Sequence, residues 1–315
     1  MSSDARATGE EPAEQEAIAA LVAASPSLAS CLHGIERAAA SDSPVLLLGE
    51  GGTGRSALAR ALHRASPRRA GPLVEVDPGV VPPTLFEGEL FGFAAGAFTG
   101  AERPSEGRVG RARGGTLVLD HVEELPLEAQ PKLLRLVAER RYAPLGGRER
   151  AADVRFVALG AADLAQRVAH GAFRDDLYYR LDVLAFRLPP LRERRGDLEP
   201  ICAFLLADLA RRFGRPLPRL GERARRWMTD YAWPGNLRQV RNVLERALIL
   251  AAGEELDPEP PEGAGEPRPR PLREVEREHV VRALAYARGH QARAAAILGI
   301  SRKALWEKRR RLGIP

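Results

Sequence analysis

The sequence is poor in cysteine, since only Cys31 and Cys202 occur among its 315 residues. They lie far apart and without neighbouring histidine pairs, so neither a disulfide framework nor a zinc site is indicated. Both are interpreted as buried small apolar residues. No apolar run is long enough to span a bilayer. The acidic start MSSDARATGEEPAEQEA lacks the basic-then-apolar order of a signal peptide, so we expect a cytoplasmic protein with no membrane partner.

Apolar residues make up 44% of the chain and charged residues 29%, which is typical of a soluble globular protein rather than a fibre or a wholly disordered chain. The length suffices for two or three compact units. The formal net charge of +6 permits nucleic acid as a partner. It does not establish one, because the position of the charge decides.

Short apolar segments have the pattern of buried strands. Pro44–Leu48 is a continuous apolar run ended by Gly49, as in a strand covered on both faces. Further strands are expected at Leu73–Asp77, Gly115–Asp120 and Val154–Ala158. Because helical segments alternate with them, the sequence predicts an α/β fold with a parallel sheet and flanking helices on both faces.

Helical segments are expected on either side of these strands. Residues 1–16 have no apolar period and predict a disordered tail, whereas Ala17–Ala40 suits one or two short helices. Leu125–Arg141 resembles a helical motif of the family named below, and Pro131 is an insertion in it that bends or restarts the helix. Ile201–Ala251 is helical by periodicity.

A glycine-rich segment directly after the first strand matches the phosphate-loop pattern G-x-x-x-x-G-[K]-[ST], except that Arg55 stands where lysine belongs. Its glycines let backbone N–H groups curl around phosphates, and the helix that follows presents its positive end to them. A plain strand-to-helix turn is the alternative. The segment consists of Gly49, Glu50, Gly51, Gly52, Thr53, Gly54, Arg55 and Ser56.

Asp120 ends the third apolar strand. An acid in this place holds a magnesium-bound water in nucleotide sites, and Ser56 joins it as a candidate metal ligand. The alternative is a core strand followed by a solvated turn.

One loop sets a single aromatic residue among residues too small to pack around it. It consists of Gly96, Ala97, Phe98, Thr99, Gly100 and Ala101. We expect Phe98 and Thr99 to project from a mobile loop and to grip another protein. The alternative is a glycine-rich connector whose Phe98 is tucked into its own core.

The C-terminal part changes composition. Gly253–Pro271 is a proline-, glycine- and glutamate-rich linker. Leu272–Ala287 predicts a helix that could pair with a copy of itself. A short helix at Gln291–Leu298, a turn at Gly299-Ile300 and an N-cap at Ser301 before Arg302–Leu312 form a helix-turn-helix pattern. DNA is the favoured partner, with a membrane or an acidic protein as alternatives.

Longer motifs resemble one known family. ELFGFAAGAFTGA, FRDDLYYRL, LPPLRER and WPGNLR are similar to motifs of the sigma-54-dependent transcription activators, a branch of the AAA+ ATPases, and GHQARAAAILGISRKALWEKRRRLGI resembles their Fis-type DNA-binding module. The resemblance covers about Ser25 to Pro315. It implies a tail at 1–16, an AAA+ core at 17–190, a helical lid at 191–252, a linker at 253–271 and a helix-turn-helix domain at 272–315. Family members often carry an N-terminal sensory domain, for which we expect no room here.

The resemblance also implies partners and residue roles. ATP and Mg²⁺ would bind at the phosphate loop, with Arg238 contacting nucleotide from the lid. Arg174 and Arg180 would reach the nucleotide of a neighbouring subunit in a homo-oligomeric ring, or in a hetero-oligomer with an active relative. Gly96–Ala101 would contact sigma-54 RNA polymerase. The residues implied to bind double-stranded enhancer DNA are Gln291, Arg293, Ser301, Arg302, Lys303, Trp306, Lys308, Arg309 and Arg310.

Four positions depart from the family pattern, and all belong to the part of the site that handles the terminal phosphate. Relatives have lysine at the position of Arg55, glutamate at His121 and a sensing asparagine at Ala161. The asparagine that pairs with the catalytic glutamate aligns with Asp77. A broad guanidinium does not freely replace a compact ammonium, and alanine donates no side-chain hydrogen bond.

The sequence therefore favours a regulator that binds nucleotide and DNA but hydrolyses ATP slowly or not at all. One alternative is a working ATPase that uses Arg55 and His121 in adjusted geometry, since imidazole accepts protons near neutral pH. Another is a non-hydrolysing subunit of a mixed ring.

Overall fold

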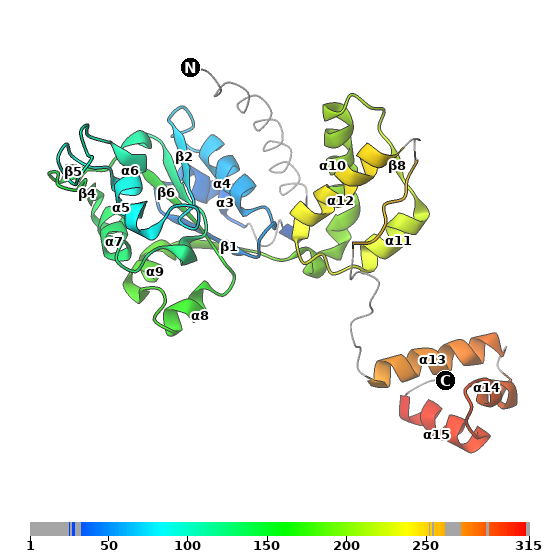
Figure 1. Cartoon of the computed structure of the whole chain (residues 1–315). Coiled ribbons are helices and arrows are strands. Elements are labelled where there is room, and N and C mark those ends of the chain that lie inside the picture. The colour runs from blue at the N-terminus through cyan, green and yellow to red at the C-terminus, as the bar shows by residue number, and fades with distance from the viewer. Residues whose placement is uncertain are drawn as a thin grey trace. The chain divides into compact units, whose positions relative to one another are not determined.

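The computed structural model describes residues 25, 27–28, 33–251, 253, 255–261, 272–287 and 290–312. The expected tail at 1–16, Cys31 and most of the expected linker lie outside these residues. Two compact units, Met1–Glu259 and Pro260–Pro315, make up the chain (Figure 1). In the described part of the chain, no helix has both the length and the apolarity that crossing a membrane requires.

A five-stranded parallel sheet forms the centre of the first unit. Its order is β2-β3-β6-β1-β7, and the strands are β1 (Val45–Gly49), β2 (Leu73–Val76), β3 (Thr116–Leu119), β6 (Arg155–Gly160) and β7 (Leu184–Leu188). All residues of β1, β3 and β6 are buried, as continuous apolar runs require. The four predicted strands are confirmed. The edge strand β7 was not predicted, because its buried and exposed residues alternate and its run is short.

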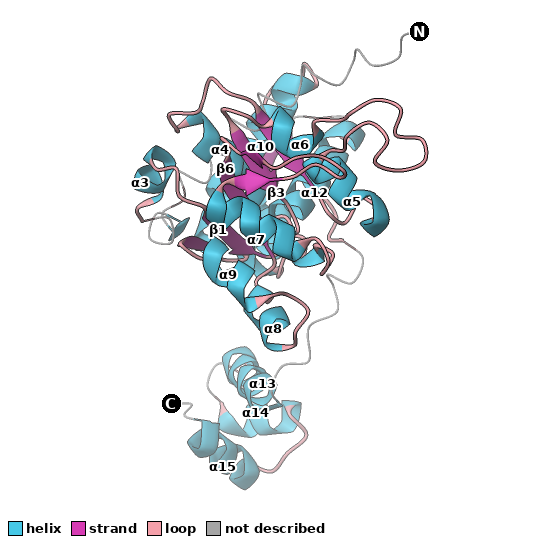
Figure 2. Ribbon diagram, turned by 90° about the vertical axis from the view of Figure 1, so that its left-hand side faces the viewer, coloured by secondary structure: helices cyan, strands magenta, loops and turns pink. Residues whose placement is uncertain are grey.

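Helices cover both faces of this sheet, as Figure 2 shows with the strands in magenta between helices. Alternate strand residues enter two separate cores: Leu46, Leu117 and Phe156 lie in one, and Leu47, Val118 and Val157 in the other. The α/β fold with flanking helices is therefore confirmed. The helices are α3 (Ile35–Ala40), α4 (Arg55–Arg64), α5 (Pro83–Phe91), α6 (Gly107–Arg111), α7 (Gln130–Glu139), α8 (Leu164–Ala169) and α9 (Asp175–Leu181).

The helix expected at Leu125–Arg141 is shorter than predicted. A 3₁₀ turn, η1 (Val122–Glu124), precedes it, and α7 begins only at Gln130 with Pro131 in its first turn. Proline fits there because the first N–H groups of a helix have no intrahelical acceptor. After α7 the chain forms an antiparallel pair, β4 (Arg141–Tyr142) and β5 (Arg150–Ala151), which was not predicted.

A helical lid completes the first unit. The region expected to be helical, Ile201–Ala251, contains three helices, α10 (Leu198–Arg212), α11 (Glu222–Asp230) and α12 (Asn236–Leu250), while β8 (Arg219–Leu220) pairs with β9 (Glu255–Leu256). The lid has its own core, in which Trp233 is 1% exposed. Cys202 lies in this core as predicted, and burial raises the pKa of its thiol to about 12.

In the residues that the structure describes, the second unit contains three helices, α13 (Leu272–Tyr286), α14 (Gln291–Ile297) and α15 (Arg302–Leu312). Val280, Ala294 and Leu305 belong to its small core. The Ser301 Oγ accepts a hydrogen bond from the Ala304 N–H at 3.1 Å, which confirms the predicted N-cap.

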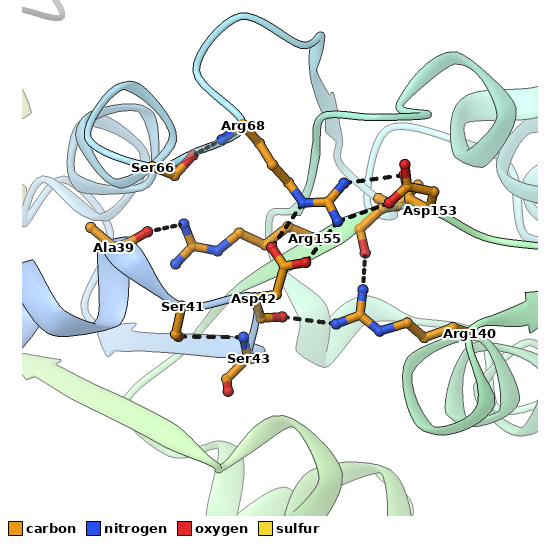
Figure 3. A network of polar contacts seen from close by, with 10 residues as sticks. Ala39, Ser41, Asp42, Ser43, Ser66, Arg68, Arg140, Asp153 and Arg155 are labelled. Carbon is orange, nitrogen blue, oxygen red and sulfur yellow. Dashed lines mark hydrogen bonds and ion pairs between the residues drawn. The ribbon is translucent and has the colours of Figure 1, made fainter.

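A polar network ties the end of α3 to the start of the central strand β6 (Figure 3). The buried Arg155 guanidinium donates to the carbonyl oxygens of Ala39 and Ala38 at 2.9 and 2.6 Å. Asp42 accepts two hydrogen bonds from Arg68, at 2.8 and 2.7 Å, and these hold the pKa of the Asp42 carboxyl below its usual range. The network therefore contributes stability that depends on Asp42 being ionised.

This dependence has a defined pH window. A carboxyl whose folded-state pKa is lowered stabilises the fold above its unfolded pKa, near 3.8, and the contribution is lost as pH falls through the folded pKa. Because the Asp42 side chain is about half exposed, we expect Asp42→Asn to cost about 1 kcal/mol or less. Thermal melts should show this difference at pH 6 and lose it progressively as the pH falls below 3.8. Glu102→Gln, on an exposed loop, is the control.

Candidate functional site

The phosphate-loop segment lies where β1 leaves the sheet and α4 begins. Gly52 and Gly54 have φ of 78° and 107°, a conformation that favours glycine. A Cβ on Gly52 would lie 2.4 Å from the Gly235 carbonyl oxygen, so only glycine fits. The Thr53 Oγ1 donates to the Glu50 carbonyl at 2.8 Å and closes the curl. The free N–H groups at the start of α4 thus border an anion cradle.

Ser56 and Asp120 come together as expected for a cation site. The Ser56 Oγ donates to Asp120 Oδ2 at 3.2 Å, although the two residues are 64 positions apart. Hard cations prefer oxygen ligands, and a hydroxyl and a carboxylate at this spacing suit one. The arrangement therefore fits a magnesium ion held beside phosphates.

Arg55 does not stand free above the loop. Its side chain is buried, at 7% exposure, and its guanidinium donates to the carbonyl oxygen of Gly160 at the end of β6. The next residue, Ala161, donates its backbone N–H to Glu123 Oε2 at 2.9 Å. Glu123 was not singled out from the sequence, because it belongs to no motif recognised there.

His121 and Asp77 form a pair at the ends of β3 and β2. The His121 ring atom Nδ1 lies 3.0 Å from Asp77 Oδ2, and the His121 backbone N–H donates to Asp120 Oδ1 at 2.9 Å. His121 has a φ of 49°, so its backbone turns sharply away from the strand. The Asp77 carboxylate contacts one ring nitrogen of His121 and so fixes the orientation of the imidazole. The second ring nitrogen, Nε2, is then its other polar atom.

The lid contacts the phosphate loop through two arginines, Arg192 and Arg194, that were not predicted to belong to the site. Arg192 donates two hydrogen bonds to Glu50, at 2.8 and 2.6 Å, and holds the pKa of that carboxyl below its usual range. Arg194 donates to the Thr53 carbonyl at 3.1 Å. Arg238, a predicted nucleotide ligand, is exposed, and its Cβ lies beside Gly52. The LPPLRER motif, which contains Arg192 and Arg194, was the sequence signal that could have identified them.

Asn236 connects the lid to the phosphate loop most directly. It is fully buried, its Nδ2 donates to the Gly51 carbonyl at 3.0 Å, and its Oδ1 accepts from the Leu191 N–H at 2.8 Å. It has a φ of 50°, which asparagine tolerates better than most residues. The loop is therefore held in shape from the lid side.

Asn236→Asp is expected to weaken nucleotide affinity about tenfold or more. Aspartate tolerates the same backbone and still accepts from Leu191, but it cannot donate to Gly51 and adds a carboxylate next to Glu50, which lies 3.3 Å from the Asn236 amide nitrogen. Titration of a fluorescent ATP analogue measures the change. Asn242→Asp, exposed on the same helix, should leave affinity unchanged; equal effects at both positions would contradict the clamp.

Arg174, directly before α9, and Arg180, on α9, have exposed side chains that contact α7 and α9 rather than the phosphate loop of their own chain. Arg174 donates to both oxygens of Asp176, at 3.0 and 2.7 Å, and Arg180 donates to the Ala138 carbonyl at 3.1 Å. Within the part of the chain that the structure describes, these side chains therefore contact α7 and α9.

The segment Gly96–Ala101 forms a tight loop closed at its base. The Gly96 N–H donates to the Ala101 carbonyl at 2.8 Å, and Gly96 and Gly100 have φ of 77° and 99°. Phe98 is 49% exposed and contacts Phe93 edge-on, with ring centroids 5.0 Å apart. Phe98 thus leans against its own base without entering a core.

In the second unit, α15 presents a basic and aromatic face. Leu305 is buried, whereas Arg302, Lys303 and Trp306, three of the residues implied to bind DNA, are exposed. Arg310 stacks over the Trp306 ring at 5.8 Å, and Ser301 caps the helix. On α14, Gln291 and Arg293 are exposed.

Two cations of α15 have a partner inside the unit. Lys308 and Arg311 both contact Glu276 of α13, and the hydrogen bond from Lys308 lowers the pKa of that carboxyl. Arg309 is half-buried. Lys308, one of the residues implied to bind DNA, therefore also joins α15 to α13.

Fold and site together define an AAA+ module, with its parallel sheet, phosphate loop and helical lid, joined to a three-helix unit with a helix-turn-helix. Family models match the chain in the same order: the Sigma-54 interaction domain at residues 21–187, the AAA+ ATPase lid domain at 192–261, and the bacterial regulatory protein, Fis family, at 271–312. The chain belongs to the family of sigma-54-dependent transcriptional regulators with a Fis-type DNA-binding domain.

Characterised relatives agree. The chain is 40% identical over 300 residues to the alginate biosynthesis transcriptional regulatory protein AlgB of Pseudomonas aeruginosa, covering 92% of this chain and 67% of that protein. It is 38% identical over 308 residues to the regulatory protein AtoC of Escherichia coli, covering 92% and 67%. NtrX of Brucella abortus, solved in complex with ATP, has a similar structure, with a TM-score of 0.71 and 32% identity over 92% of this chain and 69% of that one.

Proposed function

We propose that this chain binds ATP and Mg²⁺, contacts sigma-54 RNA polymerase through Gly96–Ala101, occupies enhancer DNA through α15, and hydrolyses ATP slowly or not at all. The observation that carries the proposal is a difference between the part of the site that would bind nucleotide and the part that would hydrolyse it. Its binding half is assembled, and its hydrolytic half lacks the groups that the family pattern places there.

ATP binding is supported by the loop and the lid. The curl of Gly49–Ser56, the clamp by Asn236 and Arg192, and the nearby Arg238 suit a nucleotide between core and lid. In the described part of the chain, no group of three or more His, Cys, Asp or Glu side chains could hold a metal. Mg²⁺ would therefore use Ser56, Asp120, phosphate oxygens and water, as it commonly does.

Slow hydrolysis follows from what surrounds the terminal phosphate. Attack by water needs a group that accepts its proton and donors that stabilise the transition state. His121 replaces the accepting carboxylate and binds Asp77, while Ala161 offers only a methyl group. Each such change commonly costs ~10²-fold in rate.

A ring position for the chain is supported by α9. Arg174 and Arg180 are exposed, which suits contact with a neighbouring copy or with an active relative. A mixed ring is the second candidate, since a subunit that hydrolyses poorly can still lend these arginines to its neighbour.

The polymerase contact makes a separate prediction. Phe98 is a large aromatic side chain held half-exposed at a glycine-closed loop, as interface anchors often are. Phe98→Ala is expected to lower affinity for sigma-54 at least 30-fold, or about 2 kcal/mol, with nucleotide trapped in the site. Binding is measured with purified sigma-54 by interferometry.

The matched control is Phe213→Ala. Phe213 is 44% exposed at the end of α10, away from the loop. It should leave sigma-54 affinity unchanged, and neither variant should alter nucleotide or DNA affinity. Undiminished sigma-54 binding by Phe98→Ala would remove the loop from the proposed interface.

A further inference from the structure

Arg55 reaches a part of the site that the phosphate loop does not contain. Its side chain begins at the first residue of α4 and ends with the guanidinium on the Gly160 carbonyl, 105 positions along the chain. Gly160 pairs in register with Leu48 of β1, and β6 lies between β1 and β3. The end of β6 is thus flanked by the phosphate loop and by the strand that leads to Asp120.

The residue after Gly160 has a small side chain and a fixed backbone. Ala161 has only a methyl side chain, so it provides no donor and takes little volume. Its backbone N–H is held by Glu123 Oε2 at 2.9 Å, which fixes the chain just beyond the carbonyl that Arg55 uses. The anchor of Arg55 is therefore a fixed acceptor.

A guanidinium carries five N–H donors in a planar fork. One nitrogen of Arg55 is bound to Gly160, and no second acceptor for Arg55 occurs among the described residues. The remaining N–H groups are available at the border between the loop and the end of β6. A lysine is a point charge with a different reach, and it would not reproduce a carbonyl anchor and an oriented donor together.

We propose that Arg55 replaces two side chains at once: it supplies the positive charge facing the terminal phosphate, and it supplies the hydrogen-bond donor at the end of β6 that Ala161 lacks. Arg55 and Ala161 then form one coupled unit, in which the small side chain leaves room for the large one. This inference rests on the proposed nucleotide site and deepens it.

Coupling of this kind makes the effects of substitution non-additive. Arg55→Lys alone removes the anchor and leaves position 161 without a donor. Ala161→Asn alone brings an amide into the space beside the guanidinium. With both changes, the asparagine donor and the lysine charge divide the two roles between them.

The test is a double-mutant cycle on the full chain. Dissociation constants for a fluorescent ATP analogue with Mg²⁺ are measured for the wild type, Arg55→Lys, Ala161→Asn and the double variant. Each single change is expected to weaken binding about tenfold, and the double variant to return within about threefold of the wild type. A double variant as weak as the product of the two single effects would overturn the proposal.

A second readout needs no nucleotide. Arg55→Lys should lower the melting temperature of the free protein, because the buried Gly160 carbonyl loses its donor. Arg60→Lys, on the same helix and ion-paired with Glu75, is the control: alone it should change neither readout, and combined with Ala161→Asn it should rescue nothing.

The two readouts separate two kinds of failure. If the wild type bound no nucleotide, the proposed function would fail, and the inference with it. If the wild type bound nucleotide and the cycle were additive, only the coupling of Arg55 with Ala161 would fail. An unchanged melting temperature in Arg55→Lys would likewise contradict the anchor.

Discussion

Replacing four side chains, by Arg55→Lys, Ala161→Asn, His121→Glu and Asp77→Asn, is expected to raise the steady-state rate of ATP hydrolysis about 100-fold or more. The variant regains a carboxylate able to accept a proton from water, an amide donor at the end of β6, and a compact ammonium at the loop. The other residues of the phosphate loop, including Ser56, are unchanged, as are Asp120 and the lid clamp, so binding should survive.

The fourth change, Asp77→Asn, is required because Asp77 contacts His121. His121 Nδ1 lies 3.0 Å from Asp77 Oδ2, so His121→Glu alone would bring two carboxylates together. Like charges at this distance raise a carboxyl pKa and disfavour the ionised base. The triple variant that retains Asp77 should therefore gain much less than the quadruple variant.

Phosphate release measured over a range of ATP concentrations separates turnover from binding. Arg60→Lys added to the wild type is the neutral control. If the quadruple variant gained nothing while still binding ATP, these positions would not limit hydrolysis.

Removal of the chain beyond Gly265 is expected to abolish specific enhancer binding, with a loss of about 1,000-fold or more in affinity. The helices α13, α14 and α15 form a unit with its own small core, and the exposed Arg302, Lys303 and Trp306 all lie on α15. Base contacts specify a site and phosphate contacts strengthen it.

Fluorescence anisotropy with labelled operator DNA, at several salt concentrations, measures this loss. The truncated chain should still bind nucleotide, which shows that the first unit remains folded. Arg302→Ala with Lys303→Ala in the full chain is a milder test that keeps the fold, because both side chains are exposed. Retention of sequence-specific binding by the truncated chain would place the DNA contact elsewhere.

Much of the fold could be predicted because buried parallel strands are continuous apolar runs. The strands β1, β3 and β6 follow this rule, and the phosphate loop follows β1 directly. The alternating strand β7 and the two-residue strands β4 and β5 give no such signal. Pro131 indicated an interruption, but its place in the first turn of α7 depends on where the chain enters the helix.

The site was predicted less completely, because its polar contacts join distant positions. The bond from Arg55 to Gly160 and the pair of His121 with Asp77 span 105 and 44 positions. Local sequence reports neither contact, and only the family resemblance relates positions 77 and 121. Asn236 lay in a recognised motif, but its role as a clamp on Gly51 appears only when lid and loop are folded together.

The central claim is that ATP is held but turned over slowly, and a single-turnover experiment tests it most directly. Protein in excess is mixed with radiolabelled ATP and Mg²⁺, alone and with enhancer DNA or an active relative, and bound label and released phosphate are followed together. The account predicts that labelled ATP binds. With the chain alone, it should remain unhydrolysed for a time in which the relative completes many turnovers. Conversion by the chain alone at the relative's rate, or no binding at all, would contradict it.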